Sequence, residues 1–172
     1  STTDANSARP VGAGAAPGHD LPVLSGLARL QLPARSLSVG LTSRMATAFA
    51  ADGSSLAAAL LTLTNLDAAG AGAIRLDHVT LRAGDRAYAT LALGAGASSV
   101  EAWVGGAKWA ESGALALDAM TATLLSSSPL AIAPGETTQV EIRMVTRKDA
   151  EPSGFRLGVD QAGIGVMQPS SA

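Results

Sequence analysis

Histidine is the side chain most often used as a general acid or base, and this chain has only two, His19 and His78. His19 lies in an N-terminal stretch rich in Gly, Ala, Ser and Pro. His78 follows Asp77 in a run that predicts a strand, where neighbouring side chains face opposite ways. This alternation argues against a His–Asp pair, and no Gly-x-Ser-x-Gly motif supplies a nucleophile. We interpret His78 as a surface residue or one that satisfies a bulge.

The fourteen carboxylates are dispersed along the chain. They complete neither an Asp-x-Asp-x-Asp-Gly calcium loop nor a His-Glu-x-x-His zinc motif. Asp67 beside Asn65, and Asp149 with Glu151, could offer loop oxygens to calcium. Solvated turn residues are the simpler interpretation, so we expect no metal site and no cofactor.

Two glutamates and three glycine clusters are the remaining candidates for a catalytic or phosphate-binding site. Glu101 and Glu111 flank an expected hairpin and could be imagined as a glycosidase pair, but acids on exposed strand ends usually form a solvated face. The glycine clusters at 12–14, 70–72 and 94–96 complete neither a dinucleotide fingerprint nor a phosphate loop. We therefore expect that the protein is not an enzyme.

The two tryptophans, Trp103 and Trp109, lie on either side of Gly105-Gly106. A diglycine between apolar runs predicts a β-hairpin. With a two-residue turn, Trp103 faces Lys108 and the indoles lie on opposite faces. With a three-residue loop, Trp103 pairs directly with Trp109. The indoles could supply core volume, form a subunit contact or make a platform for sugar rings.

Composition limits both the fold and the partners. A chain of 172 residues with 47% apolar residues suits one domain with a sizeable core. Only 3% of residues are aromatic, so that core must consist of Leu, Val, Ile and Ala. A net charge of −2 gives no excess of positive charge with which to bind nucleic acid or an anionic membrane. No run approaches the roughly 18–20 apolar residues of a membrane span. The lack of cysteine excludes disulfides and zinc–thiolate sites.

Short apolar segments separated by Gly, Pro, Asp and Ser predict strands throughout the chain. The expected extended segments are 24–32, 36–41, 54–65, 73–85, 87–94, 99–112 as a hairpin, 114–125, 129–145 around a Pro134-Gly135 turn, 153–160 and 162–167. Segments of this length and spacing, without a long amphipathic helix, are typical of an antiparallel sandwich or barrel.

Two local patterns predict which side chains are buried. Within 138–144, apolar and charged residues alternate, so we expect Val140, Ile142 and Met144 to be buried. In 73–85 the apolar residues change parity after Leu76, which predicts a bulge near Asp77-His78.

The alanine-rich stretch 55–61 is ambiguous because Ala is the best helix former. The Leu-Thr alternation that follows it favours a strand.

Residues 129–147 resemble the strand, Pro-Gly turn and strand near the C-terminal end of many bacterial immunoglobulin-like domains. Residues 61–82 resemble their strand, Asn-containing loop and next strand. The resemblance implies an all-β fold, a single immunoglobulin-like antiparallel β-sandwich, and an extracellular or cell-surface location. It implies no particular ligand. We expect the sandwich to span 21–168, with a flexible or partner-held extension at 1–20 and a short tail at 169–172.

The N-terminal residues form a candidate assembly segment. In an extended strand, one face would carry Val11, Ala13 and Ala15; the second half is too apolar to be left in water as a free tail, with Leu21, Val23, Leu24, Leu27, Leu30 and Leu32. An extension ahead of a sandwich can complete a neighbour's sheet edge by strand addition.

These observations favour a structural subunit of a bacterial surface assembly such as a filament, sheath or layer. Its partners would be copies of itself or another surface protein, with no nucleic acid and no membrane insertion. The alternative is a carbohydrate- or protein-binding module of a larger exported protein, which an exposed platform of Trp103 and Trp109 would favour.

Overall fold

The computed structural model describes residues 36–45, 52–85, 89–148, 150 and 156–167. All of them lie in the compact unit Pro33–Ala172. The predicted extension at 1–20, the strand at 24–32 and the tail at 169–172 lie outside the described residues. Within the described part, no helix is long and apolar enough to cross a membrane.

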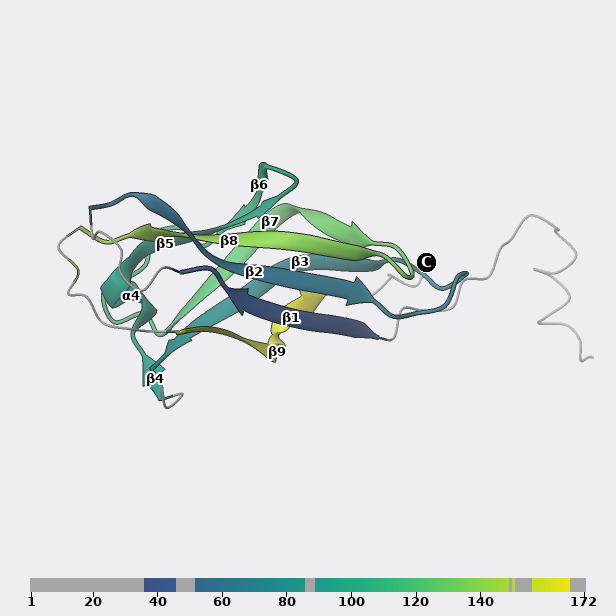
Figure 1. Ribbon diagram of the computed structural model, residues 1–172, viewed down its shortest axis with the longest axis horizontal. Coiled ribbons are helices and arrows are strands. Elements are labelled where there is room, and N and C mark those ends of the chain that lie inside the picture. Colours follow the sequence, from purple (N-terminus) through teal and green to yellow (C-terminus); the bar gives the residue numbers. More distant parts are fainter. Residues whose placement is uncertain (1–35, 46–51, 86–88, 149, 151–155, 168–172) are drawn as a thin grey trace, which may run out of the picture. The chain divides into compact units, whose positions relative to one another are not determined.

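The described part of the chain is all-β, which confirms that prediction (Figure 1). Its elements are β1 (Leu37–Ser43), β2 (Ser55–Asn65), β3 (Ile74–Gly84), β4 (Thr90–Leu91), α4 (Leu93–Gly96), β5 (Ala97–Val104), β6 (Ala107–Glu111), β7 (Thr121–Ile132), β8 (Thr137–Thr146) and β9 (Arg156–Val166).

The strands form one antiparallel sheet in the order β1-β2-β8-β5-β6-β7-β3-β4, and β9 pairs with β3. Leu76 pairs with Leu130 of β7 and also with Val166 of β9, so β7 and β9 lie on opposite edges of β3. A single pair, Glu111 with Leu125, joins β6 to β7. The sheet curves so that β1 approaches β9 (Figure 1).

Strand β8 has the predicted facing. Val140, Ile142 and Met144 are fully buried, whereas Glu141 and Arg143 remain partly exposed. β8 lies between β2 and β5 and hydrogen-bonds to both. The alternation in the sequence therefore separates the core from the outer face, as expected.

The alanine-rich stretch forms part of β2 and not a helix. β2 pairs with β1 along one edge and with β8 along the other. Its core-facing side includes Ala59, Leu61 and Leu63, all fully buried. Pairing and burial outweigh the helix preference of alanine, which is a weak local term.

The bulge in β3 is also confirmed. The register shifts between Leu76 and His78 against both β7 and β9. Ile74 and Leu76 before the shift, and Val79 and Leu81 after it, are all buried in the same core. Against β9, β3 carries one extra residue, Asp77, which restores the facing that the sequence parity would otherwise break.

Several predicted boundaries were wrong. Of the expected strand at 87–94, residues 89–94 are described; they form only the short strand β4 and the start of the four-residue helix α4. The expected strand at 114–125 begins only at Thr121 and continues to Ile132, because β7 has a long partner in β3. The two segments expected at the C-terminal end form one strand, β9.

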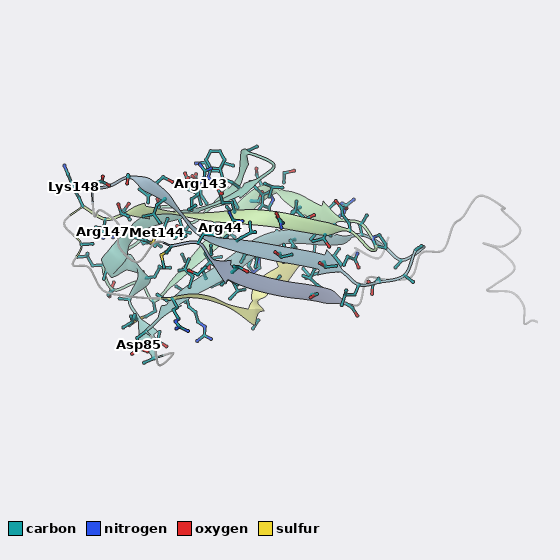
Figure 2. The ribbon with its side chains drawn as sticks, in the orientation of Figure 1. Arg44, Asp85, Arg143, Met144, Arg147 and Lys148 are labelled. Carbon is teal, nitrogen blue, oxygen red and sulfur yellow. The ribbon has the colours of Figure 1, made fainter. Side chains whose placement is uncertain are left out.

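Arg147 fixes α4 and the loop before β7. Its Nε donates to the carbonyl oxygen of Gly94 at 2.7 Å, and its Nη2 donates to that of Leu115 at 2.6 Å. Figure 2 labels Arg147 at the end of the sheet where α4 lies. A Cβ at Gly94 would lie 1.7 Å from the carbonyl oxygen of Ala116, so only glycine fits there.

Candidate functional site

The tryptophan hairpin has the two-residue turn. Gly105 and Gly106 both have positive φ, +58° and +87°, as the favoured tight hairpin turns require. Trp103 consequently pairs with Lys108. The register then shifts, so that Trp109 is the extra residue of a bulge in β6.

The two indoles have different partners. Trp103 is half-buried, its Nε1 donates to Oε2 of Glu101 at 3.0 Å, and the Arg143 guanidinium lies 4.5 Å from its ring centroid. Trp109 packs against the core, and its Nε1 donates to the carbonyl oxygen of Ser128 at 2.9 Å. The two indole N–H groups therefore donate to different parts of the chain, Glu101 and Ser128.

Charged residues surround Trp103. Lys108 Nζ contacts Oε1 of Glu101 at 3.2 Å and also pairs with Glu111. The hydrogen bond from Trp103, followed by that from Lys108, lowers the pKa of Glu101 below its ordinary value. A glycosidase acid needs a raised pKa, so this geometry argues against that role for Glu101.

Asp77 and His78 form a pair, contrary to the expectation from strand alternation. Nδ1 of His78 lies 2.8 Å from Oδ1 of Asp77. The expectation was wrong because the bulge at this point cancels the alternation that would separate neighbouring side chains. The cross-strand neighbours of His78 are Leu125 and Gly165, and neither carries a nucleophile.

Of the calcium candidates, Asn65 and Asp67 use a side-chain oxygen to accept a backbone N–H. Oδ1 of Asn65 accepts the backbone N–H of Asp67 at 3.0 Å, and Oδ1 of Asp67 accepts that of Ser36 at 3.2 Å. Among the described residues no group of three or more His, Asp and Glu could hold a metal ion. Asp149 and Glu151 lie outside these residues.

Two free sheet edges form the most distinctive surface. Within the described part of the chain, β1 pairs only with β2, and β9 pairs only with β3. A groove of about 550 Å³ lies between these strands, and its lining comprises Leu41, Ser43, Ala58, Ala59, Arg82, Ala83, Gly84, Arg156, Leu157, Gly158 and Val159. We call this surface the β1–β9 groove. Sequence reasoning did not find it because it depends on the order of strands in the sheet.

The core-facing side of β1 is partly uncovered. Val39 pairs with Leu63, and Leu41 pairs with Leu61. Directly opposed residues point to the same face, so Val39 shares the face of the fully buried Leu61 and Leu63. Val39 nevertheless keeps 39% of its surface exposed. The core is therefore less well covered at β1 than at β2.

The candidate assembly segment lies outside the described residues. Its residues Val11, Ala13 and Ala15, and Leu21 to Leu32, precede the first described residue, Ser36. Its role stays a prediction.

No protein-family profile, curated protein or solved structure matches the chain. The comparisons therefore assign no family, and the likeness to bacterial immunoglobulin-like domains stays a prediction.

Proposed function

We propose that this protein is a non-enzymatic structural subunit of an extracellular bacterial surface assembly, such as a filament, sheath or layer. Its subunits associate through β-strand addition or through contacts between sheet edges. The observation that carries the proposal is the adjacent pair of edges at β1 and β9, each paired on one side only within the described residues.

The sequence of β1 supports the proposal that its edge pairs with another subunit. Soluble proteins usually protect an exposed edge strand with charged residues, proline or a bulge. β1 reads LSVGLTS, with no charge and no proline, and its register with β2 is uninterrupted. An edge of this kind readily pairs with another strand, which suits a subunit that assembles.

The finer fold in this proposal is a single immunoglobulin-like sandwich. The single residue pair between β6 and β7 supports a division of the sheet into a five-stranded part, β1-β2-β8-β5-β6, and a part built on β3. Two such parts packed face to face would form a sandwich with one common core. The extracellular location rests on the resemblance to immunoglobulin-like domains.

The experiment compares the full chain with a variant that lacks residues 1–32, which removes the whole candidate assembly segment. Size-exclusion chromatography and electron microscopy should show polymers of the full chain and a folded monomer of the shortened one. Circular dichroism of both proteins checks that each retains its β-structure. Normal polymers of the shortened protein would exclude strand addition by this segment, and a full chain that stays monomeric at high concentration would refute the proposal.

A carbohydrate- or protein-binding module is the second candidate. The position of Trp103 favours it, since a half-buried indole that lies against Arg143, bonds to Glu101 and pairs with Glu141 can contact a sugar ring. In a Trp109→Phe background, polysaccharide should quench the fluorescence of Trp103, and a monomeric protein with such quenching would favour this function.

A further inference from the structure

We infer that the β1–β9 groove accepts residues 24–32 of a second copy of the chain as an added strand. This inference rests on the proposed assembly and specifies its two partners. The acceptor is the pair of edges at β1 and β9, each paired on one side only among the described residues, and the donor is the apolar second half of the N-terminal segment.

The backbone of the acceptor suits a strand. Seven successive antiparallel pairings lead from β1 through β2, β8, β5, β6, β7 and β3 to β9, so β1 and β9 run in opposite directions. A strand between them would be antiparallel to one and parallel to the other. Both arrangements satisfy backbone hydrogen bonds, so the added strand can pair on both sides.

The side chains of the acceptor leave room for large residues. Ala58, Ala59 and Ala83 line the groove together with Gly84 and Gly158. A cavity of about 150 Å³ holds a benzene molecule. The groove, at about 550 Å³, therefore has space for about three side chains of that size. Their burial would also cover Leu41, a partly buried residue of the lining.

Residues 24–32 have the pattern that such a site requires. In an extended chain, one face carries Leu24, Gly26, Ala28, Leu30 and Leu32, which are all apolar. The other face carries Ser25, Leu27, Arg29 and Gln31. The apolar face would supply three leucines to the groove, and the second face would point to solvent.

Because the donor segment and the acceptor edges belong to one chain, the same contact can repeat from copy to copy. Residues 24–32 precede β1 in the sequence, so every copy contains both a donor and an acceptor. When the donor of one copy occupies the acceptor of the next, the contact is heterologous. Such contacts form an open chain of subunits when the rotation between copies does not close a ring.

Cysteine cross-linking tests the contact directly, because the chain has no cysteine of its own. One protein carries Gln31→Cys on the polar face of the donor. A second, larger tagged protein carries Ser38→Cys, Gly40→Cys or Thr42→Cys, which scan the outer face of β1. After mixing and mild oxidation, we expect a disulfide dimer of the two sizes at one or two adjacent positions. Ala107→Cys, on the exposed hairpin of β6, is the matched control and should give none.

Paired substitutions test the facing. Leu30→Asp places a charge on the apolar face of the donor and should weaken association by about a hundredfold or more. Gln31→Asp, on the opposite face, should leave association nearly unchanged. On β1 the same comparison uses Val39→Asp on the core-facing side, which should weaken association, and Ser38→Asp on the outer side, which should not. Sedimentation measures assembly, and thermal melts confirm that each variant is folded.

The outcomes separate this inference from the proposed function. Assembly that persists in Leu30→Asp, without mixed disulfide dimers, overturns the inference but leaves a structural subunit that associates elsewhere. A chain with both cysteines that closes an internal disulfide and forms no mixed dimer also overturns it, because the segment then fills its own groove. Failure of the unaltered protein to assemble at all refutes the proposed function itself.

Discussion

The side-chain amide of Asn65 donates a hydrogen bond of 3.0 Å to the carbonyl oxygen of Ile132. In the other direction, the backbone N–H of Gly135 donates to the carbonyl oxygen of Asn65 at 2.8 Å. The end of β2 is thereby fastened to the turn between β7 and β8. The two segments in which the sequence resembled an immunoglobulin-like domain thus meet at one buried residue.

Replacement of Asn65 by Ala should lower the free energy of unfolding by about 1–3 kcal/mol, because Asn65 is fully buried and its loss leaves buried backbone groups without their partner. Thr64→Ala is the control, since it removes an exposed hydrogen bond to Thr137 and should cost about 0.5 kcal/mol or less. Urea unfolding measures both, and equal losses would contradict a structural role for the buried amide.

Val140→Asp should destabilise the protein by roughly 3 kcal/mol or more, because the fully buried site would hold a carboxylate without a partner. Glu141→Ala, one residue along β8, should change the free energy of unfolding little, since that side chain is partly exposed. Thermal melts make the comparison. Similar losses in both variants would be incompatible with the observed facing of β8.

Gly165→Ala should destabilise the protein by displacing His78. A Cβ at this position would lie 2.1 Å from the imidazole and 2.5 Å from Oδ1 of Asp77. In a His78→Ala background the imidazole is gone, so the same glycine substitution should cost less. A double-mutant cycle of unfolding free energies measures this coupling. Strictly additive losses would mean that the imidazole does not occupy the space over Gly165.

Acid should weaken the network around Trp103. The folded-state pKa of Glu101 is lowered, chiefly by the hydrogen bond from Trp103 and then by Lys108. A lowered folded pKa means that the stabilising contribution is present above the unfolded pKa, about 4.5, and is lost as pH falls through the folded value. Glu101→Gln should flatten the decline of stability below that pH. If Glu101→Gln lost stability with falling pH as steeply as the parent protein, ionised Glu101 would not contribute to the stability of the fold.

Local patterns predicted several elements because each depends on a few consecutive residues. The alternation around Val140 specified the facing of β8, the change of parity after Leu76 located the bulge, and Gly105-Gly106 located the hairpin turn. In each case the side-chain period or the backbone conformation of glycine determines the structure directly.

Other features could not be read from the sequence, since they depend on residues far apart. The strand order places β8 beside β2 and β5, and the β1–β9 groove follows from that order. The contacts of Arg147 with Gly94 and Leu115 likewise need the folded chain. The Asp77–His78 pair was missed for a different reason, because the rule of alternation does not hold at the bulge itself.

The central position of β8 has a consequence for synthesis on the ribosome. Eighty-one residues separate Asn65, the last residue of β2, from Thr146, the last of β8 (146 − 65). At about 5–20 residues per second, this length takes about 4–16 s to emerge. During this interval β2, which has no charged side chain, presents an unpaired edge in the nascent chain. Chaperone capacity and the rate of translation between these points should therefore govern the yield of soluble protein.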